Sequence, residues 1–295
     1  MSDTSVVAAA GATAAPPSER QQARRENWRL VRRRPAFIIG LVILLVWIVC
    51  ALFGTSFVPY DPFETREIAY ARPGGTYYFG TDQTGRDVFS RVVVGARDVL
   101  KIAPLAAFLG VLFGVILGMF MGYVGRWFDL VSGRVVEALL SLPTILIGLL
   151  AVTTLGKSNP VVIGVVAVLF TPIVAKTVRA AVMAERDLDY VTSAKLRGES
   201  TPFIMFREIL PNIWGPIIVE LTIRVGYAIF VISTLSFLGA GPPPPSPEWG
   251  AQVSQGYNDL AAGFWWTTLF PALAIASLVI AVNLIADSVQ AALEA

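Results

Sequence analysis

Six long, mainly apolar runs divide this chain, and they constrain its fold more than any other feature. A helix that crosses the hydrocarbon core of a bilayer needs roughly 20 such residues. The runs lack the alternation of membrane-barrel strands, so backbone groups in lipid must find their partners within helices. They cover residues 36–53, 102–125, 138–156, 158–175, 214–238 and 260–286. We therefore predict an all-α integral membrane protein with six transmembrane helices.

The composition excludes several classes of protein. Only 15% of the 295 residues are charged, whereas soluble domains average about 25%. The net charge of +2 is too small to suggest nucleic-acid binding. The chain has no histidine, which removes the commonest metal ligand and general base, and its single cysteine, Cys50, forms no disulfide framework. We expect no metal site and no catalytic site in this chain.

The distribution of basic residues predicts the orientation, because cytoplasmic segments are enriched in Lys and Arg. Seven arginines precede the first run, and six basic residues lie between the fourth and fifth runs. The first run exceeds the roughly 7–15 residues of a signal-peptide core, so we interpret it as a retained helix. We predict a cytoplasmic basic tail (1–35), a first helix (36–56), an extracytoplasmic loop (57–98) and a core of five helices (99–295), with both termini inside.

Glycine and proline add detail to the spans. In the second span a glycine recurs every fourth residue, at Gly110, Gly114, Gly118 and Gly122. These positions nearly align on one helix face, which lets another helix approach closely. That helix belongs either to this chain or to a partner subunit. Pro143 and Pro172 each remove one backbone hydrogen bond, so we expect bends in the third and fourth spans.

The connection between the fourth and fifth spans is long and charged, yet its pattern is helical. Asp187 or Asp189 is a candidate helix cap, Gly198 predicts a break, and Pro202 suits the first turn of a second helix. Apolar residues then recur at helical spacing, at Phe203, Phe206, Ile209 and Leu210. Their face must be buried against the membrane surface, the rest of this chain or a groove on another protein.

A charged pair, three tryptophans and one short motif near the membrane each suggest a role. Glu220 and Arg224 lie four residues apart in the fifth span, so they share a face and can pair. They either form a structural ion pair or line a translocation path. Three tryptophans, Trp249, Trp265 and Trp266, fit an interfacial aromatic belt. The stretch 151–158 fits a relaxed phosphate-binding loop, but it ends a membrane span and lacks the preceding strand, so we do not expect ATP binding there.

Four stretches resemble a known family. Tyr190, Ala194, Gly198 and the pair Leu210-Pro211 resemble the cytoplasmic signature of binding-protein-dependent ABC importer permeases, although Thr192-Ser193 replaces its Glu-Ala. The stretches 79–91, 235–250 and 269–293 resemble the C-type subunit of dipeptide and oligopeptide permeases, in the same order along the chain.

The resemblance implies a type I ABC importer permease fold, with a coupling segment (187–211) that contains a cytoplasmic coupling helix and an outer loop (240–260). It implies these ATPase-coupling residues: Tyr190, Ala194, Lys195, Gly198, Phe203, Phe206, Leu210 and Pro211. It places an outer-face motif at Gly85, Arg86 and Asp87, and Glu220 and Arg224 become candidates for the substrate path.

The resemblance also implies the partners. We expect a homologous permease subunit, two ATP-binding subunits that hold ATP and Mg²⁺, and an extracytoplasmic peptide-binding protein, in the bacterial cytoplasmic (inner) membrane. This chain would bind no cofactor and would pass di- or oligopeptides by alternating access. Nickel or another small solute is an alternative cargo. A stand-alone secondary transporter and an intramembrane enzyme are further alternatives, but we find no internal repeat and no nucleophile–base pair or metal ligands within the spans.

Overall fold

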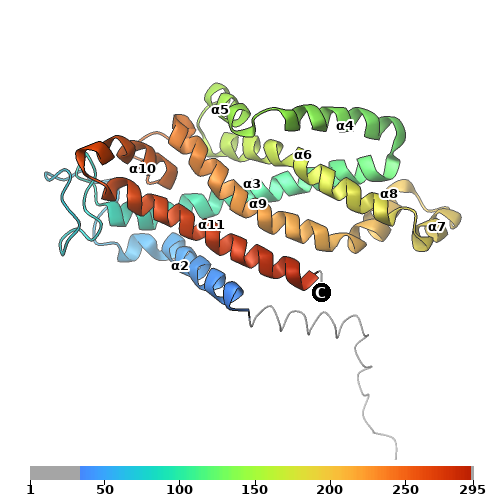
Figure 1. The fold of residues 1–295 in the computed structure, drawn as a ribbon, viewed down its shortest axis with the longest axis horizontal. Helices are drawn as coiled ribbons and strands as arrows, with labels where there is room; N and C mark the ends of the chain where they lie inside the picture. The colour runs from blue at the N-terminus through green and yellow to red at the C-terminus, as the bar shows by residue number, and fades with distance from the viewer. Residues whose placement is uncertain (1–33, 294–295) are drawn as a thin grey trace, which may run out of the picture.

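The computed structural model describes residues 34–293, so most of the predicted basic tail lies outside the described residues. Within that range the chain is mainly helical, and no strand is found. Five helices are long and apolar enough to span a membrane: α2 (Pro35–Phe57), α3 (Val88–Val124), α6 (Asn159–Glu185), α9 (Trp214–Leu235) together with η3 (Ser236–Ala240), and α11 (Trp266–Leu293). The helices α4 (Arg126–Ser141) and α5 (Thr144–Leu155) pass the same test only as a bent pair, so the candidate spans number five, or six if this pair counts as one span. The predicted all-α membrane fold is confirmed (Figure 1).

The helix α3 is much longer than its apolar run. Its 37 residues extend about 55 Å, against roughly 30 Å of hydrocarbon. It begins directly after Asp87, whose carboxylate accepts the backbone N–H of Ser90 at 2.8 Å. The predicted loop (57–98) is therefore wrong in its last part, since the charged residues after Val88 are helical and lie beyond the apolar run.

The third span is broken. The axes of α4 and α5 meet at 90°, and the predicted run 138–156 straddles the break. Leu142 is extended there, as expected for a residue that precedes a proline. The bend predicted at Pro143 is confirmed, whereas α6 continues through Pro172 as one helix.

The glycine face of α3 packs against α6 of the same chain. A Cβ atom at Gly118 would lie 2.6 Å from the carbonyl oxygen of Ala175, and one at Gly122 would lie 2.7 Å from Cβ of Val182. Because the two backbones approach so closely, this face is occupied within the subunit. Of the two possibilities left open by the sequence, packing within the chain is the correct one.

The remaining helices pack around this pair. The helix α2 contacts α11 at Gly40 and α3 at Gly54, and most of its other surface is exposed. Between α9 and α11, the predicted outer loop (240–260) folds into α10 (Trp249–Gly256) and the 3₁₀ helix η4 (Tyr257–Ala262). The last span therefore starts at Trp266, later than predicted.

Two of the three tryptophans do not form an interfacial belt. Trp249 and Trp266 are buried, and their indole N–H groups donate to the carbonyl oxygens of Val92 (2.8 Å) and Thr81 (3.1 Å). Only Trp265 is exposed. The belt prediction is wrong for Trp249 and Trp266, because backbone carbonyls of this chain satisfy their donors and let the rings pack in the core.

Candidate functional site

Two polar regions lie at opposite ends of the bundle. One end carries the predicted coupling segment, and the other carries α10 and the loop 58–87 (Figure 1). The coupling segment contains α7 (Asp189–Leu196), α8 (Thr201–Phe203), the π-helical turn η1 (Ile204–Ile209) and the 3₁₀ turn η2 (Leu210–Asn212).

The structure confirms the predicted break within the coupling segment but not the predicted helix cap. Gly198 has a φ of +76° and ends α7, a conformation that favours glycine. Pro202 lies in the first turn of α8. Leu188 precedes α7 and its side chain makes no capping bond, so the prediction that Asp187 or Asp189 caps the helix is wrong. Asp189 instead lies in the first turn, where its charge favours the helix dipole.

The apolar residues of the coupling segment form two faces. One face is buried against α3 and α6 of this chain and contains Val191, Ala194, Ile204, Met205 and Ile209. The other face, called here the exposed apolar face, consists of Leu188, Leu196, Phe203 and Phe206, which are 46%, 84%, 38% and 40% exposed. The chain thus covers one side of the segment and leaves the other uncovered. Leu196 was not predicted, although an apolar residue in the last turn before a glycine break is a usable signal.

Polar contacts fix the segment to the bundle. The hydroxyl of Tyr190 donates to Glu185 at 2.7 Å; burial, followed by this hydrogen bond, raises the pKa of Tyr190 to about 12. Lys195 lies 5.7 Å from the centre of the Tyr123 ring of α3. Arg197 pairs with Glu208 at 3.0 Å across the Gly198 break.

The predicted coupling residues thus differ in accessibility. Ala194 is fully buried, Tyr190 and Leu210 are partly buried, and five are exposed: Lys195, Gly198, Phe203, Phe206 and Pro211. The five exposed residues are accessible to another protein, and Tyr190 and Leu210 are accessible only in part. Ala194 is not accessible, because it packs in the core with α3 and α6.

At the other end, Asp82 organises a tight turn. One of its oxygens accepts the backbone N–H groups of Thr84 (2.8 Å) and Arg86 (2.9 Å), and the other lies 3.2 Å from the Arg86 guanidinium. Gly85 has a φ of +77°, and any Cβ there would overlap the carbonyl oxygen of Arg66. The predicted motif Gly85, Arg86 and Asp87 therefore forms a turn with an Arg–Asp pair, followed by the cap of α3.

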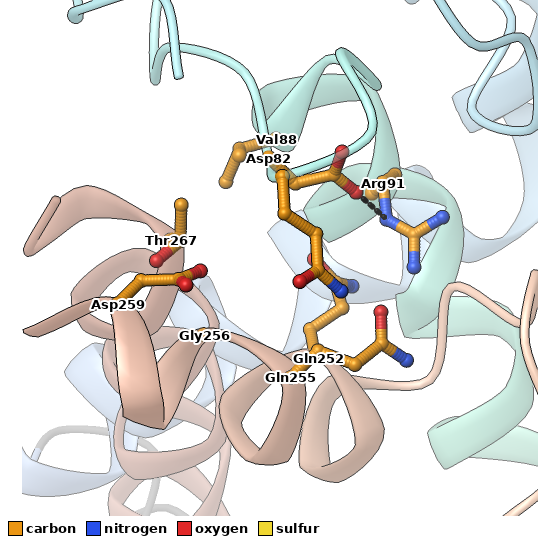
Figure 2. A pocket seen from close by; sticks show the side chains of 9 residues that line it. Asp82, Val88, Arg91, Gln252, Gln255, Gly256, Asp259 and Thr267 are labelled. Carbon is orange, nitrogen blue, oxygen red and sulfur yellow. Dashed lines mark ion pairs between the residues drawn. The ribbon is translucent and has the colours of Figure 1, made fainter. Parts of the chain in front are cut away.

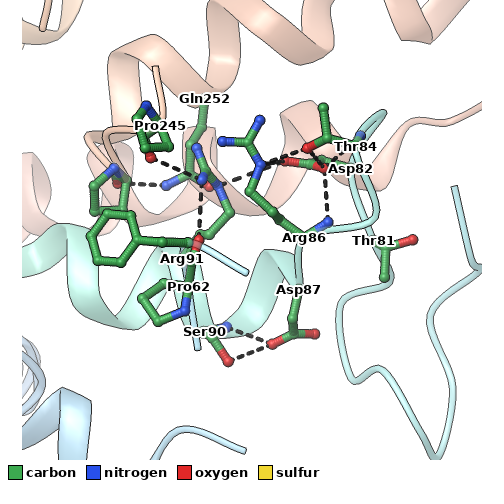
Figure 3. A network of polar contacts seen from close by, with 12 residues as sticks. Pro62, Thr81, Asp82, Thr84, Arg86, Asp87, Ser90, Arg91, Pro245 and Gln252 are labelled. Carbon is green, nitrogen blue, oxygen red and sulfur yellow. Dashed lines mark hydrogen bonds and ion pairs between the residues drawn. The ribbon is translucent and has the colours of Figure 1, made fainter. Parts of the chain in front are cut away.

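Arg91 joins this turn to a proline-rich loop, residues 241–248 (Figure 3). Its side chain is 1% exposed and donates to the carbonyl oxygens of Pro62 (3.2 Å), Pro245 (3.1 Å) and Ser246 (3.0 Å). It also lies 3.8 Å from Asp82. We call Asp82, Thr84, Arg86 and Arg91 the Asp82 cluster. Arg91 was missed as a site residue because its partners come from segments distant in sequence.

A small cavity adjoins the Asp82 cluster (Figure 2). Its volume is about 10 Å³, close to the minimum that holds one water molecule. Its polar lining residues come from the Asp82 turn, α3, α10, η4 and α11: Asp82, Gln83, Arg91, Gln252, Gln255, Asp259 and Thr267. A peptide does not fit, so in this conformation the cavity supports the loops and does not bind a substrate.

The charged pair in the fifth span is formed. Arg224 Nε lies 2.9 Å from Glu220 Oε2, and the hydroxyl of Thr177 on α6 donates to the other oxygen at 2.8 Å. The guanidinium also lies over the rings of Phe170 and Tyr227. The predicted pairing is confirmed and joins α9 to α6; a role in the substrate path stays a prediction.

No group of three or more His, Cys, Asp or Glu side chains is placed to hold a metal ion within residues 34–293. The stretch 151–158 forms the end of α5 and the following turn, and no strand precedes it within the described residues.

Comparison with known proteins extends these observations. Residues 114–295 match the family of binding-protein-dependent transport system inner membrane components, and residues 23–73 match the N-terminal transmembrane domain of oligopeptide transport permease C. The chain is 34% identical to the dipeptide transport system permease protein of Alkalihalophilus pseudofirmus, over 95% of this chain and 93% of that protein. It is 39% identical to a putative peptide transport system permease protein of Brucella suis (90% and 89%), and 34% identical to the glutathione transport system permease protein of Pectobacterium atrosepticum (92% and 90%).

Proposed function

Since the chain belongs to the family of binding-protein-dependent transport system inner membrane components, we propose that it is a permease subunit of an ATP-driven importer of di- and oligopeptides. The similar proteins named above are designated for dipeptide, peptide and glutathione transport. Glutathione is itself a short peptide, so a peptide is the cargo these names share. The chain contributes helices and contacts and performs no catalysis.

The proposed assembly has three kinds of partner. A homologous permease completes the pore, two ATP-binding subunits hold ATP and Mg²⁺, and an extracytoplasmic protein delivers the peptide. We place the coupling segment in the cytoplasm of a bacterial inner membrane, with the N-terminus on the same side. The basic residues between α6 and α9 support this orientation.

The observation that carries the proposal is the exposed apolar face of the coupling segment. Leu196, Phe203 and Phe206 are uncovered there, while the opposite side of the same segment packs into the bundle. An apolar helix face of this kind suits a groove on another protein. Closure of an ATPase dimer bound at this face would move α7 and, through its packed side, the ends of α3 and α6.

The test replaces the exposed apolar face while leaving the buried face intact. In the assembled transporter, Leu196→Asp and Phe206→Asp should each lower the amount of ATPase subunit that co-purifies, or lower peptide-stimulated ATP hydrolysis, about tenfold or more. Such a loss is the usual size for a central apolar contact. The matched control is Phe63→Asp, which places the same charge on a half-exposed aromatic residue at the opposite end. Wild-type ATPase binding and coupled hydrolysis in both test variants, or peptide uptake by this chain reconstituted alone, would refute the proposal.

A further inference from the structure

Tyr227 lies near the middle of the fifth span. The span Trp214–Ala240 has thirteen residues on either side of it, which corresponds to about 20 Å to each end. A second measure agrees, because the Arg224 guanidinium lies 5.3 Å from the centre of the Tyr227 ring and 5.8 Å from that of the Phe170 ring. Phe170 precedes Lys176, the first charge after the uncharged part of α6, by about 9 Å of helix. The Tyr227 side chain therefore lies deep within the level of the hydrocarbon.

The phenol of Tyr227 has no polar partner in the folded chain. Its side chain is 53% exposed, and its hydroxyl forms no hydrogen bond to any residue that the structure describes. Other hydroxyls on α9 differ, since those of Thr222 and Thr234 each donate to a backbone carbonyl one turn earlier, at 2.8 Å. From this depth a tyrosine is too short to carry its polar tip to the membrane surface.

Lipid around Tyr227 would leave this hydroxyl unsatisfied. The hydrocarbon core holds no water, so an unpaired polar group there carries a free-energy penalty. Exposed positions at similar depth on two other helices are apolar: Val46, at the centre of α2, is 54% exposed, and Val168 of α6 is 61% exposed. Lipid can cover those two side chains, whereas the exposed phenol needs water or a polar ligand.

A second polar group without a partner lies beside this position. Asn283 of α11 is exposed, and its carboxamide forms no hydrogen bond within residues 34–293. Its Oδ1 atom lies against Gly226, where a Cβ atom would be only 2.7 Å away, and α9 and α11 pack side by side (Figure 1). Neighbouring positions on two packed helices thus expose a phenol hydroxyl and a carboxamide at close to the same level of the membrane.

We propose that Tyr227 and Asn283 line the path of the cargo through the membrane and form hydrogen bonds with the main chain of the passing peptide. This inference rests on the proposed function, since it names the groups that meet the cargo. A peptide presents N–H donors and carbonyl acceptors along its length, whatever its side chains. A phenol hydroxyl both donates and accepts, and a carboxamide does so through separate atoms, so the pair suits main-chain amides of any sequence. Water satisfies the same groups between cargo molecules.

The first experiment measures the access of water to these positions. Cys50→Ala removes the single cysteine of the chain, and Tyr227→Cys, Asn283→Cys or Val46→Cys is then introduced into the assembled transporter in proteoliposomes. During ATP-driven uptake of dialanine, the thiols are labelled with a small cationic methanethiosulfonate, and the mass of this chain is followed. We expect labelling at 227 and 283 to be about tenfold faster than at Val46, the control of similar depth and exposure, because a thiol in hydrocarbon stays protonated and unreactive.

The second experiment tests contact with the peptide itself. Tyr227→Phe keeps the ring and removes only the hydroxyl, so kcat/KM for dialanine uptake should fall about fivefold, the usual effect of one lost hydrogen bond. Tyr78→Phe removes the same group from a similarly exposed tyrosine of the outer loop, 58% exposed, and should leave uptake unchanged. The unfolding midpoint of the purified chain should be the same in both variants and the wild type, since a structural role alone would shift it.

Three results would overturn the inference in a transporter that takes up dialanine. The first is labelling of Tyr227→Cys no faster than that of Val46→Cys, and the second is an unchanged kcat/KM in Tyr227→Phe. The third is a photoreactive residue at position 227 that cross-links to the homologous permease and not to peptide. Failure of the proposed function is distinguishable, because the wild-type transporter would then take up no dialanine. The peptide contact would fall with it, while fast labelling would still identify the path.

Discussion

Glu248 is a deeply buried carboxyl group outside the spanning helices, 1% exposed. It precedes α10, and its two oxygens accept the backbone N–H groups of Gly250 (3.1 Å) and Ala251 (2.8 Å). Burial raises its pKa to about 7, even though these hydrogen bonds act in the opposite direction, and the nearby Asp98 adds to the rise. The native state therefore holds a proton at this position more tightly than the unfolded chain does.

This raised pKa predicts a pH dependence of stability. Below the unfolded value of 4.5 the group is protonated in both states and has no effect. As the pH rises toward 7, the unfolded state loses its proton first, so the unfolding free energy falls. The fall is on the order of 3 kcal/mol and is complete above about pH 7. Thermal unfolding of the purified chain in detergent between pH 4.5 and 8 measures it.

The control for this dependence is a pair of identical substitutions. Glu248→Gln should flatten the pH profile over this window, whereas Glu64→Gln, at a largely exposed residue, should leave it unchanged. A profile in Glu248→Gln as steep as in the wild type would show that another group carries the effect.

The ion pair between Glu220 and Arg224 supports a second prediction at the residue scale. Glu220→Gln or Arg224→Gln leaves one largely buried charge unpaired, so each should lower the unfolding free energy by about 3 kcal/mol. The exchange Glu220→Arg with Arg224→Glu should restore much of the loss, since the hydroxyl of Thr177 can accept as well as donate a hydrogen bond. Unfolding in detergent measures all three variants, and absence of rescue by the exchange would indicate separate roles.

At the scale of elements, the contact between α3 and α6 can be tested with one substitution at two positions. Gly118→Ala places a methyl group 2.6 Å from a backbone oxygen of α6, so the helices must separate, and we expect a loss of about 1–3 kcal/mol. Gly164→Ala lies on α6 with open space around it. It should be neutral or stabilising by up to about 1 kcal/mol. Equal effects on the unfolding midpoint would argue against close packing at Gly118.

The sequence predicted the spans and their breaks, but it did not predict the start of α3 or the helix α10, and each outcome has a physical reason. Apolar length identified the spans, and Pro143 and Gly198 marked real breaks. The early turns of α3 were missed because a helix outside the bilayer tolerates charges that a spanning segment excludes. The helix α10 was missed because proline and glycine precede it, and its burial depends on contacts with distant segments, such as that of Trp249 with Val92.

The features of the candidate sites also fall into those that the sequence predicts and those that only the folded chain shows. Local features of the coupling segment were predictable, since a glycine break and helical spacing are properties of neighbouring residues. The role of Arg91 was not predictable, because its shared hydrogen bonds arise only when the chain is folded. Leu196 had a local signal in the glycine break that follows it, but only the folded chain shows how far its side chain is exposed. The glycine face likewise indicated a close helix contact without identifying α6 as the partner.

At the scale of the whole molecule, Arg91 of α3 connects this helix to the loops 58–87 and 241–248. Replacing it tests whether these contacts hold the two loops in place. Arg91→Lys keeps the charge but loses the planar set of donors. A lysine at this position therefore cannot make all three hydrogen bonds to the carbonyl oxygens of Pro62, Pro245 and Ser246. Each hydrogen bond from a charged group contributes about 1.5–3 kcal/mol. We expect hydrogen exchange in residues 58–87 and 241–248 to rise about tenfold or more. Arg97→Lys, on the exposed side of the same helix, should leave both segments protected, and equal exchange in the two variants would contradict this role.

The length of α3 has a mechanical consequence. Its first residues are anchored beside the Asp82 cluster, its last turn carries Tyr123 next to Lys195 of the coupling segment, and its C-terminal half is packed closely against α6. Pro104 lies between these two ends and removes a backbone hydrogen bond from the helix, so α3 can bend there. If α7 moves as the proposed function requires, the part of α3 after Pro104 should therefore move together with α6, while the part before it stays with the loops at the opposite end.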